Sequence, residues 1–489
     1  MSEFTRTAPP KAANVRLATA GLLIGMLLSV LDQTVVAIAL PDIAADLGGP
    51  DMIGPDTSGM GTSGMGTSGM GTSGWVVTSY VLASTATGAL YGRVSDRFGR
   101  RAVFVGAVAL FVAGSALCGL AQTIAQLIAA RTVQGIGAGA LFVLPTIALS
   151  ELYPARLRGR VQGLTGGVFA VASVGGPLAG GAITDVWGWR WIFYINLPLG
   201  LLAMSLAAYA LRLPAPGGGG RADVAGAALV AGAMVSLLLV AEWGGRVLAW
   251  GSPVIVALIG AFAALVALFV WWERRAADPL FPPRLLADPA LRVVLPATAL
   301  LGALLGGSIV YLPTYLQAAY GMGATQAGLA LNPYVLTFMA VSSLAGARIG
   351  AGGRFKPYLL AGAAIVALAF VLLGRLDPGT AYVVLAVELG VLGAGFGLLM
   401  QNLVVVAQNA ASPADLATTT SATVSVRGLG LSLGVAVFGT LLTRELQGRA
   451  PGPQATAAAI PDVLIWGAPA ALALLALLAL LPRSERRAG

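Results

Sequence analysis

The chain has 489 residues, of which 57% are hydrophobic and only 10% are charged. Soluble domains carry about 25% charged residues, so this composition excludes a soluble globular protein and indicates a membrane protein. The net charge is +9. The chain contains no histidine, which excludes histidine-based metal sites and leaves carboxylates, hydroxyls and water as groups that could relay a proton.

Apolar stretches long enough to cross a bilayer, about 20 residues each, recur along the whole chain. The first follows a polar tail, residues 1–16, and lacks a small-residue cleavage site, so we expect a retained span and not a signal peptide. The sequence therefore predicts an all-α membrane protein with fourteen transmembrane helices, at residues 17–40, 75–92, 102–121, 126–149, 161–183, 191–211, 223–243, 253–272, 293–316, 325–346, 357–376, 380–404, 417–442 and 461–481.

Asp32 interrupts the first of these stretches, which reads LLSVLDQTVVAIALP around it. Hydrocarbon solvates a carboxylate poorly, so such a group must be paired, neutralised or in contact with water. Ionisable residues at membrane depth usually mark an ion or substrate path. We therefore expect Asp32 to carry a proton in a transporter.

The first connection contains a five-residue repeat, TSGMG, over residues 57–75. A Gly/Ser/Thr segment cannot bury a core, so we expect a flexible loop over 50–74. Its methionines, Met60, Met65 and Met70, have the thioether chemistry of a Cu(I) site, but we favour a tolerated repeat expansion in an exposed loop. We expect no metal site.

The second connection reads GRVSDRFGRR. Its glycines allow unusual backbone angles, its aspartate can pair with arginine or face a helix N-terminus, and its arginines can anchor at lipid headgroups. A generic basic loop accounts for the pattern equally well. The residues concerned are Gly92, Asp96, Arg97, Gly99, Arg100 and Arg101.

Away from their ends, the predicted spans contain three further charged residues. Arg131 lies at a depth comparable to that of Asp32, where an arginine would favour the ionised carboxylate while burial would disfavour it. Glu388 is predicted as a second proton site or a counter-charge for cationic substrates, although it could also reach the outer water. Arg427 is expected to anchor or pair structurally.

The fifth stretch contains the glycine-rich sequence GGPLAGG. Small residues allow membrane helices to approach closely, and proline can bend a helix. Ordinary small-residue packing and a dry contact that blocks proton leak are both compatible with it. The residues are Gly175, Gly176, Pro177, Gly180 and Gly181.

Basic residues are distributed unevenly between the connections. If the spans alternate from a cytoplasmic N-terminus, 22 of the 29 basic residues lie on the cytoplasmic side, five lie outside and two lie within spans. The positive-inside rule then places both termini in the cytoplasm. We expect the protein to lie in the plasma membrane. Attraction to anionic headgroups explains the net charge without nucleic acid.

These segments together resemble the major facilitator superfamily. The 92–101 loop is similar to the family's loop signature, with Val94 in place of leucine. The segment around Asp32 resembles the first-helix signature of fourteen-span drug:proton antiporters of the EmrB/QacA-like branch. LIAARTVQGIG around Arg131 resembles the fourth-helix motif, GGPLAGG the fifth-helix antiporter motif, and WRWIFYINLP from Trp189 the opening of the sixth helix.

The resemblance implies two six-helix bundles that rock around a central cavity, at 17–211 and 293–481, with two additional helices within 212–292 and short tails at 1–16 and 482–489. Residues 346–356 look like a decayed copy of the 92–101 loop, as expected for internal repeats. The resemblance also implies that Asp32 is the coupling acid and that Arg131 senses it. The fifth-helix motif implies an exporter.

We therefore expect a monomeric secondary transporter that exports drug-like, amphipathic or cationic molecules in exchange for protons, with the proton gradient as its energy source and no cofactor. A dedicated exporter of one metabolite and an uptake symporter remain alternatives. An ATP-driven pump and an enzyme are disfavoured, since no phosphate-binding loop or nucleophile–base set appears. Candidate cavity residues are Gln33, Tyr311, Tyr315, Asn332, Tyr334, Phe338 and Gln401.

Overall fold

The computed structural model describes residues 12–47, 74–213, 223–244, 248–276, 285, 287–352, 355–412, 415–447, 449 and 452–482. The expected repeat loop, apart from its last residue, lies outside them, as do the ends of both tails. The described helices are α1 (Ala12–Leu47), α2 (Gly74–Phe98), α3 (Arg100–Leu120), α4 (Ile124–Leu152), α5 (Ala155–Trp187), α6 (Trp191–Tyr194), α7 (Asn196–Ala210), α8 (Val224–Trp243), α9 (Pro253–Glu273), α10 (Pro289–Tyr320), α11 (Ala324–Ala330), α12 (Asn332–Gly352), α13 (Lys356–Leu373), α14 (Tyr382–Ala410), α15 (Leu416–Leu446), α16 (Pro453–Leu464) and α17 (Gly467–Ala479).

Every apolar stretch predicted from the sequence coincides with a helix or with a pair of helices in line. The three pairs are α6–α7, α11–α12 and α16–α17. In each pair the second helix has a proline within its first three residues, at Pro198, Pro333 and Pro469. Proline is tolerated at the start of a helix because the first N–H groups have no intrahelical acceptor. Proline does not by itself end a helix in this protein, since α4 and α10 continue through Pro145 and Pro313.

Ten helical segments among the described residues are long and apolar enough to cross a membrane. The remaining predicted spans correspond to α2, α5, α8 and the α11–α12 pair. Helices α2, α5 and α12 carry many glycines, serines and threonines, which lower their mean hydropathy. These three helices pack against other helices of the bundle, so their polarity does not place them in water.

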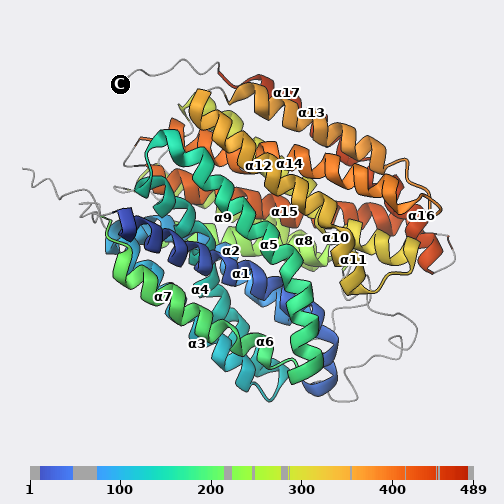
Figure 1. Ribbon diagram of the computed structural model, residues 1–489, viewed down its shortest axis with the longest axis horizontal. Helices are drawn as coiled ribbons and strands as arrows, with labels where there is room; N and C mark the ends of the chain where they lie inside the picture. Colours follow the sequence, from blue (N-terminus) through green and yellow to red (C-terminus); the bar gives the residue numbers. More distant parts are fainter. Residues whose placement is uncertain are drawn as a thin grey trace, which may run out of the picture.

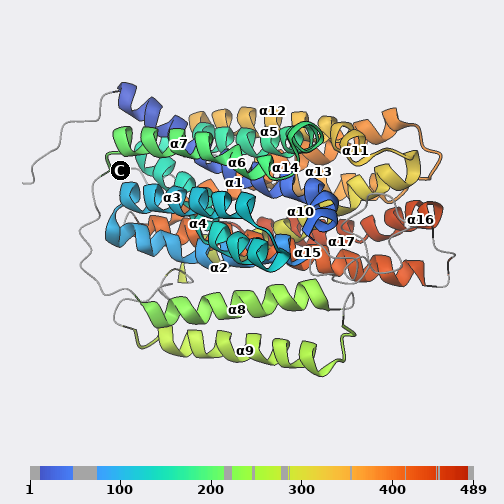
Figure 2. The ribbon, with the colours of Figure 1, turned by 90° about the horizontal axis from the view of Figure 1, so that it is seen from below.

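The helices run along the long axis of the molecule in two groups (Figure 1). One group includes α1–α7 and the other α10–α17. The second group buries a large apolar cluster; the first contributes most of two further clusters, one of which also includes Ala417 and Val424 of α15. Helices α8 and α9 pair with each other as a hairpin to one side of both groups (Figure 2). The hairpin reaches the bundle through α8, which packs against α2 and α15.

The tightest packing in the second group joins α10 to α15 through glycines on both helices. A methyl group on Gly434 would lie 2.5 Å from the Cα of Ala303, and Gly302 of α10 faces the backbone of Arg427 in the same way. Neither helix can yield locally, because the neighbouring atoms belong to the backbone. We expect Gly434→Ala to lower the free energy of unfolding by about 1–3 kcal/mol.

Thermal unfolding of the purified protein in detergent measures this loss. Gly260→Ala on α9 is the matched control, since its methyl group would meet nothing within 4 Å. An equal melting temperature for the two variants would contradict the packing argument.

The two groups meet through α2 against α15 and through α5 against α12. The groups also meet through α14, which contacts α4 and α5 at the end of the bundle where the described chain begins, at Ala12, and finishes, at Pro482; we call it the terminal end (Figure 1). There Gln408 donates to the carbonyl of Thr146 at 3.4 Å, and Arg158 donates to Asn409 at 3.4 Å. The halves are therefore in contact at the terminal end.

Candidate functional site

Asp32 and Arg131 form an ion pair within the first helical group. Nη1 of Arg131, on α4, lies 2.5 Å from Oδ2 of Asp32, on α1, and neither side chain has any exposed surface. The two residues are 99 positions apart in the sequence, so the contact exists only because α1 and α4 pack together. The comparable depth that the sequence predicted for them is confirmed.

Two amide side chains complete the environment of the carboxylate. Gln134, one helical turn after Arg131, and Asn196, the first residue of α7, each donate to Oδ1 of Asp32 at 2.8 Å. Asn196 also donates to Oγ of Ser115 at 3.0 Å, and Ser115 donates to the carbonyl of Phe193. Both oxygens of the carboxylate therefore accept hydrogen bonds from donor side chains, as a buried charge requires.

Arg131 is held by contacts on three sides. Its Nε donates to the carbonyl of Val76 at 3.2 Å, its Nη1 also donates to Gln134, and its guanidinium lies 4.1 Å from the centroid of the Tyr80 ring. Its Nη2 and the Oδ1 of Asn196 have no hydrogen-bond partner among the described residues. A buried donor and a buried acceptor thus remain unused beside the carboxylate.

This arrangement links the charge of Asp32 to the position of Arg131. A proton on Asp32 would remove the ion pair and leave the guanidinium unpaired in a low-dielectric interior, which is strongly unfavourable. Protonation therefore requires that the surroundings of Arg131 change at the same time. The site can couple a proton to a rearrangement of α1, α4 and α7.

Near the C-terminal end of α1, Asp46 contacts the turn before α6. Arg190 donates to its Oδ2 at 2.5 Å and Trp189 at 3.0 Å. The hydrogen bond from Arg190, followed by that from Trp189, holds the pKa of Asp46 below its usual value. These contacts tie α1 to the turn that leads, six residues after Arg190, to Asn196.

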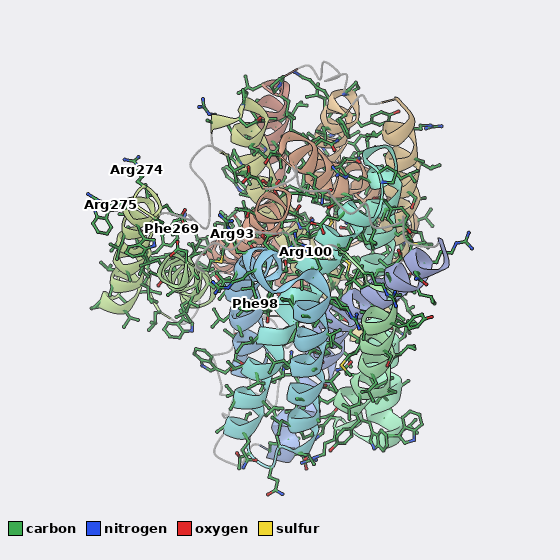
Figure 3. All side chains as sticks on the ribbon, turned by 90° about the vertical axis from the view of Figure 1, so that its left-hand side faces the viewer. Arg93, Phe98, Arg100, Phe269, Arg274 and Arg275 are labelled. Carbon is green, nitrogen blue, oxygen red and sulfur yellow. The ribbon has the colours of Figure 1, made fainter. Side chains whose placement is uncertain are left out.

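The expected 92–101 loop is almost entirely helical, since α2 continues to Phe98 and α3 begins at Arg100. A single arginine of this segment is buried. Arg100 donates to Asp96 at 2.5 Å, to Glu151 at 2.8 Å and to Ser95 at 2.6 Å, whereas Arg97 and Arg101 are exposed. Gly99 adopts φ 85°, a conformation that side chains disfavour, and allows the turn between α2 and α3. Figure 3 shows Arg93, Phe98 and Arg100 at this end of the bundle.

Gly92, by contrast, is a point of contact between the two groups. A methyl group there would overlap Oγ of Ser421 and lie 2.9 Å from the carbonyl oxygen of Ala417, both on α15. Asp96 follows one turn later along α2, and its Oδ2 has no partner among the described residues. The loop therefore combines an internal ion network with a close contact to the other group.

The glycines of the fifth-helix segment do not share one face. Gly176 and Gly180 lie against α1, where added methyl groups would meet Thr34 and Val35, while a methyl group on Gly175 would meet nothing within 4 Å. Thr34 also donates to the carbonyl of Ala172 at 3.4 Å. Helix α5 thus covers α1 two residues after Asp32. The helix continues through Pro177 and Gly181 to Trp187.

The candidate cavity residues do not all lie together. Tyr311 and Tyr315 are buried within the second group and donate to the carbonyls of Val435 and Asp377. Phe338 and Gln401 approach Gly166 of α5, where the groups meet. The remaining three are Tyr334, which stacks on Phe338; Asn332, half-buried at the start of α12; and Gln33, exposed on α1.

Glu388 is buried on α14, and its Oε2 has no hydrogen-bond partner among the described residues. Tyr315 and Tyr320 of α10 lie within electrostatic range of its carboxylate. It is therefore separate from the Asp32 network, which lies in the other group.

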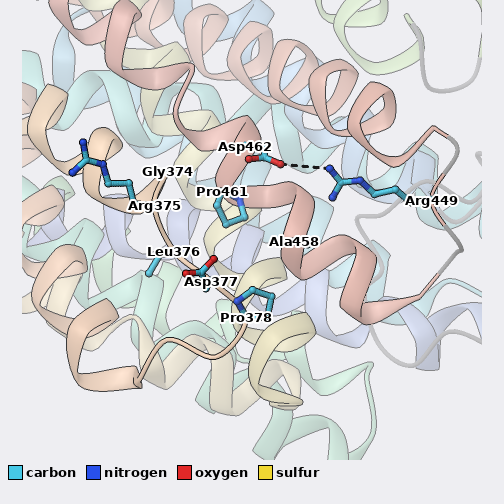
Figure 4. A pocket seen from close by; sticks show the side chains of 9 residues that line it. All are labelled: Gly374, Arg375, Leu376, Asp377, Pro378, Arg449, Ala458, Pro461 and Asp462. Carbon is cyan, nitrogen blue, oxygen red and sulfur yellow. Dashed lines mark ion pairs between the residues drawn. The ribbon is translucent and has the colours of Figure 1, made fainter.

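A surface pocket of about 300 Å³ opens at the end of the bundle opposite the terminal end (Figure 4). It contains the ion pair between Arg449 and Asp462, at 3.5 Å. None of the candidate cavity residues lines it. The lining residues are Gly374, Arg375, Leu376, Asp377, Pro378, Arg449, Ala458, Pro461 and Asp462.

Comparison with known proteins identifies the family. The family model described as Major Facilitator Superfamily matches residues 22–226 and 222–435. The chain belongs to the major facilitator superfamily. It is therefore an all-α, multi-pass membrane protein of a family of secondary transporters of small molecules, which are not enzymes.

Several curated members of the superfamily are similar to the chain. An uncharacterized MFS-type transporter of Mycobacterium tuberculosis is 38% identical over 90% of this chain and 61% of its own length, so the chain spans about three fifths of that relative. Multidrug resistance protein 3 of Bacillus subtilis is 34% identical over 89% of this chain and 81% of its own length. The multidrug transporter protein MdtP of the same species is 31% identical, over 88% and 76%.

Solved structures agree on the fold. The human organic anion transporter MFSD10 superposes with a TM-score of 0.67 at 18% identity, covering 95% of this chain and 99% of that one. The proton:xylose symporter XylE superposes with a TM-score of 0.62 at 16% identity, covering 96% and 100%. At these identities the likeness establishes the architecture alone.

Proposed function

We propose that this transporter exports drug-like, amphipathic molecules, cations included, in exchange for protons by alternating access. The transport unit is a monomer in the plasma membrane, with both termini cytoplasmic and fourteen spans: six in 17–211, two in 212–292 and six in 293–481. The multidrug relatives from Bacillus subtilis support export. The terminal end is then the cytoplasmic end, and the described contacts close it.

The observation that carries the proposal is the fully buried pair of Asp32 and Arg131. A carboxylate within a membrane span is energetically costly, and such residues usually lie on an ion, substrate or proton path. The unused Nη2 of Arg131 leaves the guanidinium able to donate to a new acceptor when Asp32 takes up a proton. Gly176 and Gly180 hold α5 over this part of α1, which supports a seal against proton leak.

The exchange cycle follows from the electrostatics of the pair. From the state with a closed cytoplasmic end, a proton entering from outside neutralises Asp32 and frees Arg131. The loss of the ion pair loosens α1 against α4, and the halves rock about the α2–α15 and α5–α12 contacts. Binding of substrate from the cytoplasmic side favours release of the proton inward, and the ion pair re-forms.

The test uses purified protein in liposomes that are acidic inside, with lumenal pH followed after lipophilic cations are added. Wild-type protein is expected to dissipate the gradient, and Asp32→Asn is expected to lose at least about 100-fold of that rate, since carboxylate proton transfer contributes on that order in other systems. Asp377→Asn, a change at an exposed carboxylate of the pocket, should leave the rate unchanged.

The three possible outcomes separate the competing functions. Equal dissipation by wild type and Asp32→Asn would remove Asp32 from the proton path and transfer the role to Glu388. Accumulation of substrate with the proton would indicate an uptake symporter. A response to one metabolite and to no lipophilic cation would indicate a dedicated exporter.

A further inference from the structure

Three arginines among the described residues are less than 10% exposed: Arg100, Arg131 and Arg427. The first two have carboxylate partners at hydrogen-bonding distance. Arg427, which is 6% exposed, makes no hydrogen bond or ion pair with any residue that the structure describes; its contact is with the ring of Phe142, whose centroid lies 5.3 Å from the guanidinium carbon. The sequence predicted that Arg427 anchors or pairs structurally; among the described residues its contact is an aromatic ring and not a carboxylate.

Arg427 lies where the two groups meet and far from either end of its helix. It is the twelfth residue of α15, about 16 Å from the first at the usual rise per residue. Its backbone packs on Gly302 of α10, the next residue faces Thr85 of α2, and its side chain extends to Phe142 of α4. Helices of both halves thus surround the guanidinium.

An unpaired guanidinium at this depth is unfavourable unless an anion reaches it. A cation–π contact is worth about 2 kcal/mol when desolvated, which is less than the several kcal/mol required to bury one ion. The buried acids of the spans do not supply the counter-charge: Asp32 is engaged with Arg131, and Glu388 is the seventh residue of α14, which begins at the opposite end of the bundle. The counter-charge must therefore come from outside the described chain.

We propose that Arg427 binds the anionic group of a transported amphipathic acid, a carboxylate attached to an apolar or aromatic body. A planar guanidinium can donate two parallel hydrogen bonds to a carboxylate, and the Phe142 ring beside it offers an apolar surface to the body of the molecule. The proposal rests on the proposed export function and specifies one of its substrate classes. Because Phe142 and Arg427 belong to different halves, the bound acid would contact both.

The test is calorimetric titration of the full-length protein in lipid nanodiscs with biphenyl carboxylate and biphenyl carboxamide, corrected for binding to empty nanodiscs. Wild type is expected to bind the carboxylate at least about tenfold more tightly than the amide, which corresponds to about 1.4 kcal/mol. Arg427→Gln should bind the two equally, Arg427→Lys should retain part of the preference, and Arg375→Gln, at an exposed arginine, should keep all of it. Size-exclusion profiles and melting temperatures verify that the variants are folded.

Two results would overturn the proposal: an undiminished preference for the carboxylate in Arg427→Gln, or displacement of that ligand by chloride alone with no advantage of the organic acid over chloride. Both results are independent of the proton-exchange assay, because binding is measured without a proton gradient. If wild type fails to exchange protons but shows an Arg427-dependent preference, the anion site stands and the export function falls. If exchange requires Asp32 but the preference survives in Arg427→Gln, the export function stands and this inference falls.

Discussion

Arg131→Ala is expected to abolish proton exchange and to lower the free energy of unfolding by about 3–5 kcal/mol at about pH 8, because removing one member of a buried ion pair leaves the other uncompensated. Asp32 would retain only the amide donors of Gln134 and Asn196. The variant with both Asp32→Asn and Arg131→Ala should recover more than half of this loss, since no buried charge remains.

The sign of the pH dependence provides an independent check. In Arg131→Ala the buried carboxylate is relieved by taking up a proton, so the folded state binds more protons than the unfolded state and stability rises as the pH falls from about 8 to about 5. The double variant should lack this slope. Melting temperatures in detergent across this range measure both effects.

The control for this cycle is Arg190→Ala, which breaks the pair with Asp46. Both side chains of that pair are more than a third exposed, so its loss should be worth less than about 1 kcal/mol. Losses of equal size for Arg131→Ala and Arg190→Ala would show that burial does not strengthen the Asp32 pair. A double variant as unstable as Arg131→Ala would show that the unpaired carboxylate is not the cause.

The lengths of the apolar runs were sufficient to predict the helices, and the positions of the charges within them placed Asp32 and Arg131 at comparable depth. Apolar runs of span length are among the strongest signals in any sequence. The contact itself was not predicted, because depth alone does not determine which side chain a charge meets. The broken helices were not predicted, although Pro198, Pro333 and Pro469 carried the signal.

The polar partners of the pair were only partly accessible from the sequence. Gln134 and Asn196 stand within the segments that resemble family motifs, yet a neutral amide in an apolar stretch does not reveal which side chain it contacts. Ser115 gave no signal, because a single serine on a membrane helix usually bonds its own backbone. These contacts depend on the rotation of α3, α4 and α7 about their axes.

The glycines show the same limit. Composition predicted close helix approaches, but the approaches at Gly176 and at Gly175 differ although the residues are adjacent: the first meets α1 and the second meets open space. Arg427 is a sharper case, because a charge within a predicted span suggests a partner, and the described chain offers none. The sequence alone did not determine which faces of the helices pack against each other.

Gly92→Ala is expected to shift the transporter away from the conformation in which the terminal end is closed. The added methyl group would lie 2.9 Å from the carbonyl oxygen of Ala417 and would overlap Oγ of Ser421. The serine can rotate, but the carbonyl is backbone, so α2 and α15 must separate. Overpacking of this kind costs about 1–3 kcal/mol, which changes the ratio of two conformations by about 5- to 150-fold.

Distances between spin labels at Phe98 of α2 and Arg348 of α12, both exposed near the terminal end, report this shift when Cys118 is replaced by alanine. Wild type should show a population at short distance, and Gly92→Ala should move most of it to longer distances. Gly106→Ala on α3, where a methyl group would meet nothing within 4 Å, should leave the distribution unchanged.

Exchange should fall together with the population shift, because a transporter held in one conformation cannot complete its cycle. The reason for choosing alanine is that the smallest possible side chain already meets the backbone of α15, so the effect does not depend on bulk or charge. An unchanged distance distribution with normal exchange would mean that the α2–α15 contact at Gly92 can yield without cost. The closed terminal end would then have to be held by the contacts of α5 with α12 instead.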